Sequence, residues 1–304
     1  MCAGSTEEAP SPFVLAVASG KGGTGKTLVA TNMSVLASAH LARVVLVDCD
    51  VEAPNDHLFL SSAEVSATPV EVLVAQVDTS QCAACGRCRD ACAYGAVRLL
   101  GGSAIVFEEL CHGCGVCSDV CPQNAVREVP RRVGEVVVGP VIARDRLVLV
   151  TGRLDVGQVK SPSVIRSARS AARAIATDLV VLDAPPGVAC SAVAAVRGAD
   201  ALLLVAEPTP FGLHDLELSL RLGRELRLPM GILVNRDVGA GDEIEYLCRA
   251  WDVPILARIP FDRQVAETYA RGELIIDTLP AVSQILAALP KAMRALAPHE
   301  VVAR

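Results

Sequence analysis

The sequence predicts an α/β fold in which a doubly wound, mostly parallel sheet is interrupted by a small, inserted, cysteine-rich α+β domain. Short apolar runs at residues 44–47, 179–182 and 201–206 alternate with helical segments, which is typical of a parallel sheet with helices on both faces. A glycine-rich loop follows the first predicted strand. Two similar cysteine runs separate the second predicted strand from the rest of the alternating pattern.

The strands and helices are predicted in the following order. Residues 13–19 form a strand, residues 26–40 a helix and residues 43–48 a second strand. Downstream, four or so further strands alternate with helices such as residues 163–176. Because the upstream piece has too few strands to form a sheet alone, the cysteine-rich segment is most simply an insertion. We therefore expect a disordered leader at 1–12, an α/β domain split into 13–60 and 136–304, and an insertion at 61–135.

Composition and charge narrow the class of protein. Of the 304 residues, 52% are hydrophobic and 3% aromatic, so a large aliphatic core can form. The net charge is −6 with both signs interspersed, which argues against nucleic acid as a partner. The N-terminus shows no signal peptide, and the apolar runs are too short to cross a membrane. We expect a cytoplasmic protein.

The C-terminal segment SQILAALPKAMRALAPHE is predicted to form a helix that packs on the α/β domain. It contains few basic residues, unlike an amphipathic helix that lies on a membrane. Pro290 is expected to break this helix in the middle, because proline lacks an N–H group and clashes with the preceding turn. We expect no stable membrane association.

The stretch ASGKGGTGKTLVATN carries a phosphate-binding motif. Gly20, Gly25, Lys26 and Thr27 satisfy G-x4-G-K-[ST] between a predicted strand and a predicted helix. Lys26 is expected to reach the β and γ phosphate oxygens, and the Thr27 hydroxyl to bind Mg²⁺. A glycine turn without a ligand is the alternative, which this context disfavours. The predicted ATP-binding residues of the loop are Gly20, Lys21, Gly22, Gly23, Thr24, Gly25, Lys26, Thr27 and Leu28.

Acidic residues follow two strands, in VVLVDCDVEAPN and LVVLDAPPG. Carboxylates beside a phosphate loop can hold Mg²⁺ through water and orient the attacking water. We assign Asp50 to this shell and Asp183 to a Walker-B-like role. Asp48 has two open interpretations: a similar role, or a strand-end carboxylate that accepts local backbone N–H groups.

Eight of the twelve cysteines fall within 40 residues. The runs CAACGRCRDACAYGAVR and CHGCGVCSDVCPQNAVR begin at Cys82 and Cys111 and match at an offset of 29 residues. Each has the C-x2-C-x2-C-x3-C spacing of two-cluster ferredoxins. A long chain without a signal peptide favours metal binding over disulfides. Zinc is the competing ligand, but two complete four-cysteine runs argue against it.

In the ferredoxin pattern, three cysteines of one run and the fourth of the other hold each [4Fe–4S] cluster. Pro122 follows Cys121 as this pattern expects, whereas Ala93 follows Cys92. The predicted ligands are Cys82, Cys85, Cys88 and Cys121 for cluster one, and Cys111, Cys114, Cys117 and Cys92 for cluster two.

Together, KGGTGKT, DCDVEAPN, DAPPG and ILVNR resemble the deviant-Walker ATPases of the MinD, ParA, Mrp and nitrogenase-iron-protein superfamily. With its cysteine runs, the chain resembles a MinD-like branch that carries a ferredoxin insertion. The resemblance implies a homodimer in the ATP state, in which Lys21 touches the partner's nucleotide and joins Asp50 and Asp183 as a catalytic residue. It also implies that Asn235 hydrogen-bonds the adenine edge. EPTPFGLHDL fits this branch without a chemical role beyond ending a strand and starting a helix.

The cysteines outside the two runs are interpreted as packed thiols. Cys190 lies seven residues after Asp183, a step that resembles a cluster-ligand position of nitrogenase iron protein. The stretch TGRLDVGQVKSPS offers no second cysteine for such a bridging cluster. The others are Cys2, Cys49 and Cys248.

Three functions fit these motifs. In the first, dimer closure around ATP gates electron transfer through the clusters to an unidentified redox partner. In the second, the protein is an Mrp-like carrier that delivers clusters to an acceptor protein, although full ligation by eight cysteines argues for retained clusters. In the third, it is a MinD-like positioning ATPase with structural or sensory clusters, which the missing membrane helix disfavours.

Overall fold

The computed structural model describes residues 11–239 and 242–297. Residues 1–10 of the predicted leader, and Cys2 with them, lie outside these residues. One nine-stranded sheet dominates the described part of the chain, in the order β11-β10-β9-β1-β8-β2-β7-β6-β3. Its parallel strands are β1 (Phe13–Ala18), β2 (Val44–Asp48), β7 (Leu147–Leu154), β8 (Leu179–Asp183), β9 (Ala201–Ala206), β10 (Met230–Asp237) and β11 (Ile255–Pro260). The predicted α/β fold with a mostly parallel sheet is confirmed.

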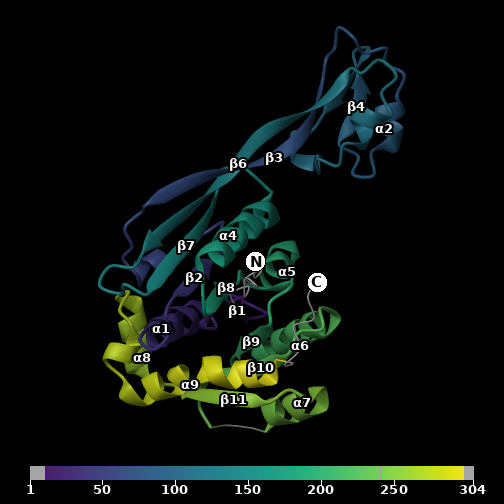
Figure 1. Ribbon diagram of the computed structural model, residues 1–304. Coiled ribbons are helices and arrows are strands. Elements are labelled where there is room, and N and C mark those ends of the chain that lie inside the picture. Colours follow the sequence, from purple (N-terminus) through teal and green to yellow (C-terminus); the bar gives the residue numbers. More distant parts are fainter. Residues whose placement is uncertain (1–10, 240–241, 298–304) are drawn as a thin grey trace, which may run out of the picture.

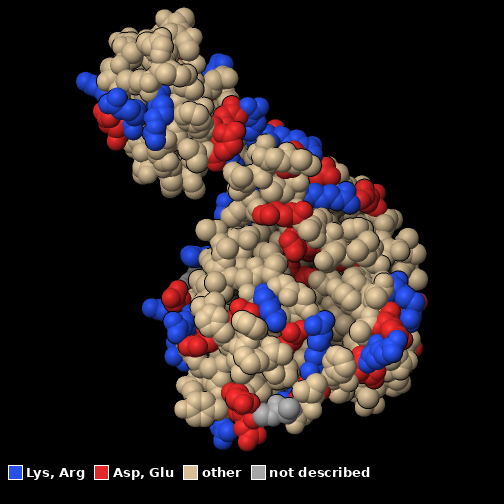
Figure 2. Space-filling view, turned by 180° about the vertical axis from the view of Figure 1, so that it is seen from behind, with Lys and Arg blue, Asp and Glu red and all other residues tan. Residues whose placement is uncertain are grey.

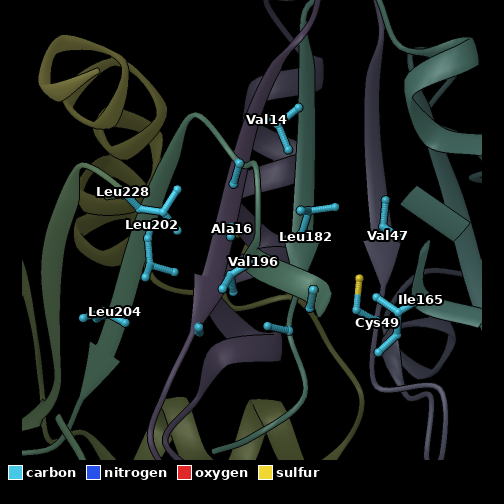
Figure 3. Packing of buried hydrophobic residues seen from close by; sticks show 14 of the residues in the cluster. Val14, Ala16, Val47, Cys49, Ile165, Leu182, Val196, Leu202, Leu204 and Leu228 are labelled. Atoms are coloured by element: carbon cyan, nitrogen blue, oxygen red, sulfur yellow. The ribbon is translucent and has the colours of Figure 1, made fainter. Parts of the chain in front are cut away.

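Two cores lie on opposite faces of this sheet because side chains alternate along each strand. On β1, Val14 and Ala16 face the first core, and Leu15 and Val17 face the second. Figure 3 shows part of the first core, with Cys49 and Ile165 among its members. Helices α4 (Ser161–Ile175), α5 (Cys190–Val196), α6 (Pro210–Glu225) and α7 (Glu243–Trp251) cover the first core, and α1 (Lys26–Ser38), α8 (Arg263–Ala270) and α9 (Pro280–Leu296) cover the second.

The C-terminal helix corrects one prediction. Helix α9 continues through Pro290 without a break. An interior proline costs roughly 3 kcal/mol, but burial of each large aliphatic side chain returns about 1.5–3 kcal/mol. Leu286 and Leu289 are buried before the proline and Met293 after it, so packing holds both halves in one helix. No helix among the described residues is long and apolar enough to span a membrane.

The cysteine runs lie at the end of a long antiparallel ribbon (Figure 1). Its strands are β3 (Ser66–Val77) and β6 (Val126–Pro140). All of β3 pairs with residues 126–138 of β6, but β6 pairs with β7 only from Gly134 onward. The ribbon therefore leaves the large sheet and carries residues 78–125, which we call the cysteine module. The predicted boundary at 135 falls inside β6, whose last residues belong to the large sheet, whereas the boundary at 61 precedes β3. The module contains α2 (Arg87–Ala91), β4 (Val97–Leu100), β5 (Ser103–Val106) and α3 (Val116–Asp119).

The neck between the module and the body carries charges of both signs (Figure 2). Arg132 pairs with Asp155 at 2.9 Å and with Glu135 at 3.1 Å. Such half-exposed ion pairs contribute at most about 1 kcal/mol each. The direction of the ribbon is therefore set mainly by its strand pairing.

Candidate nucleotide site and cysteine-lined hollows

The phosphate loop closes between β1 and α1 with little room for side chains. A Cβ on Gly20 would lie 2.2 Å from the carbonyl oxygen of Asp215. Gly25 has a φ of 99°, and a Cβ there would lie 2.4 Å from the Asn235 amide nitrogen. Glycine is therefore required at both positions, at Gly20 by close packing and at Gly25 also by backbone conformation.

A cavity of about 250 Å³ opens beside this loop. Its lining includes the predicted residues Gly22, Gly23, Gly25, Lys26, Thr27, Leu28, Asp50, Asp183 and Asn235. Gly20, Lys21 and Thr24 lie outside the lining in this conformation. The fold therefore brings most of the predicted nucleotide residues to one cavity, although they come from four different segments.

Thr27 and Asp183 meet at the floor of the cavity. The Thr27 hydroxyl donates to the Asp183 carboxylate at 2.7 Å and lies 3.3 Å from the Asn55 side-chain oxygen. The second carboxylate oxygen of Asp183 is buried and has no hydrogen-bond partner among the described residues. Hydroxyl and carboxylate oxygens are the ligands that Mg²⁺ prefers, so this donor set fits the predicted metal.

Lys26 and Asp50 line the same cavity, and the charge of each affects the pKa of the other. Burial lowers the pKa of Lys26, and the charges of Asp183 and Asp50 oppose that shift. Burial likewise raises the pKa of Asp50, which Lys26 opposes. A phosphate bound in the cavity would place a negative charge beside the buried Lys26 ammonium and so stabilise its protonated form.

Asp48 has the strand-end role, the second of its two interpretations. Its carboxylate accepts the backbone N–H groups of Asn55 at 2.8 Å, Asp56 at 3.0 Å and Asp50 at 3.1 Å. Burial and the charge of Asp183 raise its pKa to about 7 despite these bonds. Asp48 therefore shapes the loop that carries Asp50.

Asp56 is a buried acid that the sequence analysis missed. Its two carboxylate oxygens are buried without a hydrogen-bond donor among the described residues. Burial and the charges of Asp48 and Asp183 raise its pKa well above the usual range. Asp56 therefore adds a third buried carboxyl group beside Asp48 and Asp183. No spacing in the sequence indicates this, because Asp56 reaches the site only through the turn built on Asp48.

Lys21 points away from the cavity toward Glu207. Its ammonium lies 3.2 Å from the Glu207 carboxylate, which also accepts a hydrogen bond from Arg236 at 2.5 Å. Glu207 is mostly buried, whereas the Lys21 side chain is 33% exposed. The segment after β9 therefore has a chemical role that sequence analysis did not find, which is to hold Lys21, the first lysine of the loop.

Asn235 is bonded to the phosphate loop. Its amide nitrogen donates to the carbonyl of Thr24 at 2.7 Å, and its oxygen accepts the Arg236 N–H. The adjoining wall of the cavity is formed by residues from the end of β11 to α8 that sequence analysis missed, including Phe261 between these elements and Tyr269 in α8.

The eight cysteines of the module line two separate hollows. Each hollow combines three cysteines of one run with the fourth of the other, which is the predicted division. All are free thiols rather than disulfides. No three ligand side chains converge on a single ion among residues 11–239 and 242–297, but the thiolates of a four-iron cluster bind four different iron atoms. The hollows are lined by Cys82, Cys85, Cys88 and Cys121, and by Cys111, Cys114, Cys117 and Cys92.

Backbone N–H groups point at sulfur atoms in a pattern that repeats between the two runs. Ala96 donates to Cys92 at 3.3 Å, and Ala125 donates to Cys121 at 3.2 Å. Corresponding bonds of 3.4 Å join Ala104 to Cys82 and Ala75 to Cys111. Such bonds stabilise thiolates and tune the potentials of iron–sulfur clusters.

Two adjacent residues, Lys160 and Ser161, connect the loop that follows β2 to the hollow that contains Cys111. The Ser161 hydroxyl donates to the carboxylate of Glu52 at 2.6 Å, and Glu52 lies between Asp50 and Asn55 in sequence. The Lys160 ammonium donates to the backbone carbonyl of Cys111. The loop that carries Asp50 is therefore connected to a cysteine of the module through one dipeptide.

Cys190 corrects a further prediction. Cys49 and Cys248 are buried as expected, but Cys190 is exposed. It is the first residue of α5, and it lies outside the buried face of this helix, which is formed by Ala192, Ala195 and Val196. The thiol is therefore accessible.

The fold and the phosphate loop define a P-loop nucleotide-binding protein of the MinD/ParA ATPase type. The family described as CbiA, the CobQ/CobB/MinD/ParA nucleotide binding domain, matches residues 15–275, and the chain belongs to this family. A relative from Methanocaldococcus jannaschii, MJ0578, is 32% identical over 271 residues, which cover 89% of this chain and 92% of the relative. The ATP-binding protein MJ0547 of the same organism is 23% identical over 88% of this chain and 81% of its own length.

Solved structures show the same fold. The cell division ATPase MinD of Pyrococcus furiosus aligns with a TM-score of 0.56 and 20% identity, over 94% of this chain and 99% of that one. MinD of Pyrococcus horikoshii, complexed with Mg-ADP, aligns with a TM-score of 0.57 and 20% identity, over 93% and 97%. None of these names refers to an iron–sulfur cluster.

Proposed function

We propose that the protein is a Mg²⁺-dependent ATPase whose nucleotide state gates electron transfer through two [4Fe–4S] clusters to a partner protein. One observation carries this proposal: eight cysteines, divided as two-cluster ferredoxins require, line two hollows on a ribbon rooted in the nucleotide-binding sheet. The thiols and their N–H···S bonds fit clusters of this kind. When bound, the clusters would supply one-electron carriers.

The nucleotide chemistry is assigned to residues that already meet in the cavity. Lys26 binds the β and γ phosphates, Thr27 and Asp183 hold Mg²⁺, and Asp50 orients the attacking water. Lys21 is held by Glu207 within one chain. In the ATP-bound homodimer that we propose, Lys21 leaves Glu207 and reaches the partner's nucleotide.

The coupling is assigned to Ser161 and Lys160. A change in the loop around Asp50 on nucleotide binding would move Glu52 and, through its 2.6 Å hydrogen bond, Ser161. Lys160 follows because it is the neighbouring residue, and its ammonium sits on the carbonyl of a predicted ligand, Cys111. Moving a positive charge beside a cluster changes its potential, which supports nucleotide control of electron transfer.

The names of the compared proteins favour a different candidate. MinD is named as a cell division ATPase, which suits the positioning alternative better than electron transfer. In that case the clusters would be structural or sensory. A fluorescent fusion that shows polar or oscillating localisation would support the positioning candidate, whereas uniform fluorescence would count against it.

The decisive experiment is anaerobic reconstitution followed by iron analysis and EPR. About eight iron atoms per chain are expected from two cubanes. Reduced protein should then pass electrons to an acceptor faster with ATP than without it. Bound zinc with little iron would overturn the cluster assignment, nucleotide-independent transfer would overturn the gating, and transfer of clusters to an apo-protein would favour the carrier alternative.

A further inference from the structure

A hollow of about 720 Å³ lies between α4 and α5. Arginines surround it, while its floor is apolar and includes Pro162, Val193 and Ala194. No aspartate or glutamate of the described residues lines it. The arginines are Arg166, Arg169 and Arg173 of α4 and Arg197 at the end of α5.

These arginines are held in place but not neutralised. Arg169 donates to the carbonyl of Ala194 and Arg173 to that of Gly198, both at 2.7 Å. None of the four arginines forms an ion pair within 4.0 Å with any residue that the structure describes. Because two guanidinium groups are already ordered, less side-chain entropy is lost when an anionic group binds them.

The hollow continues along α4 toward the cysteine module. A second hollow of about 450 Å³ shares Arg166 and Ser170 with the first. It reaches His112 and Gly113, which lie between the predicted cluster ligands Cys111 and Cys114. Glu71 is its acidic lining residue. Figure 1 shows α4 and α5 on the part of the body nearest the module. We call the two hollows together the arginine trench.

We propose that the arginine trench is the docking surface for an acidic segment of a partner protein. Carboxylates pair with guanidinium groups in a planar, two-bond geometry, and the apolar floor accepts aliphatic side chains of the same segment. Nucleic acid offers phosphates but no such side chains, so the floor favours protein. A partner seated here also touches the loop between two predicted cluster ligands. The docking proposal does not depend on the proposed clusters, whereas electron delivery to this partner rests on the proposed function.

Docking can be tested without loaded clusters, using a fluorescein-labelled peptide rich in Glu and Leu and the full-length protein. The test variant is Arg166→Glu with Arg197→Glu, because neither side chain joins α4 to α5. The matched control is Arg144→Glu with Arg146→Glu, two exposed arginines in the turn between β6 and β7. Fluorescence anisotropy should show that the test variant binds the peptide at least about tenfold more weakly, a loss of ~1.4 kcal/mol. The control should keep the wild-type affinity.

Three results would overturn the docking proposal. The first is equal peptide affinity in wild type and test variant, or no binding to either. The second is binding of a DNA duplex, but not the peptide, through the same arginines. The third is loss of ATP-dependent dimerisation in the test variant, which would make the trench a contact between copies. Peptide binding by a protein that cannot hold iron would leave docking intact and refute only the cluster function.

Discussion

The nucleotide site and the cysteine module differ in what holds them in place. The phosphate loop joins β1 to α1, and both elements are buried in large cores on the two faces of the sheet. The module has only a small cluster of buried residues, and two of its members, Cys88 and Cys111, are predicted metal ligands. The first site is held by the two cores of the sheet, whereas we expect the second to depend on its proposed clusters. Small units of this size usually need a metal or disulfides to stay folded.

The largest effect is expected when the iron of the proposed clusters is removed from the cysteine module. Chelation of reconstituted protein should unfold the module, because metal binding and folding are coupled in small metal sites. Limited trypsin digestion should then cut at Arg98, while the affinity for ATP changes less than about twofold, well under 1 kcal/mol. Untreated holoprotein is the control. A chelated module that resists trypsin would show that its own core is sufficient.

Variants of Lys26 and Lys21 should distinguish ATP binding from ATP-dependent dimerisation. Lys26→Ala should weaken ATP binding by roughly 100-fold, since hydrogen bonds between charged groups contribute up to ~3 kcal/mol. Lys21→Ala should bind ATP nearly normally but lose hydrolysis and ATP-dependent dimerisation. Calorimetry, phosphate release and light scattering measure these effects. If both variants simply lose ATP, Lys21 has no separate role.

The buried acids should make the Mg²⁺-free protein less stable at high pH. The pKa of Asp48 is raised to about 7 and that of Asp183 to about 6, so the folded state binds protons that the unfolded state releases near pH 4. The stabilising contribution of these protons is therefore fully present below about pH 4 and is lost as the pH rises through about 6 and 7. Asp56→Asn should raise the melting temperature at pH 8, because it removes a buried carboxyl group that lies beside Asp48 and Asp183 and whose pKa is raised by burial and by their charges.

Thermal unfolding at pH 5 and pH 8, with EDTA and with Mg²⁺, measures this effect. The stabilisation by Asp56→Asn should be smaller at pH 5, where the acids already carry protons. If Asp56→Asn changed the melting temperature equally at both pH values, protonation of these carboxyl groups would not explain the effect.

The smallest effect is expected at the link between the two regions. Ser161→Ala removes the hydrogen bond to Glu52, and Ser163→Ala is a matched control on the same helix. With Ser161→Ala, the ATP-induced change in the EPR spectrum of the reduced clusters should shrink while ATP affinity stays within about threefold, under 1 kcal/mol. An ATP response equal to that of Ser163→Ala would place the coupling elsewhere.

Much of the fold follows from local patterns. Buried strands and a phosphate loop are encoded within a few residues, and the spacing of the cysteines is enough to divide the predicted ligands into two sets. Pro290 shows the limit of such patterns. A proline inside a helix lowers the stability of that helix, but burial of the leucines on the same helix outweighs this cost. Sequence analysis alone does not give the balance between these two free energies.

The sequence by itself determined the class of protein, the phosphate loop and the two cysteine sets, because each depends on motifs of residues that lie close together in the chain. Only the tertiary structure decided what surrounds them. Glu207 holds Lys21 from the segment after the distant strand β9, and Ser161 donates a hydrogen bond to Glu52 across 109 positions of the sequence. Contacts of this kind depend on how helices and strands pack, because no local spacing brings the partners together.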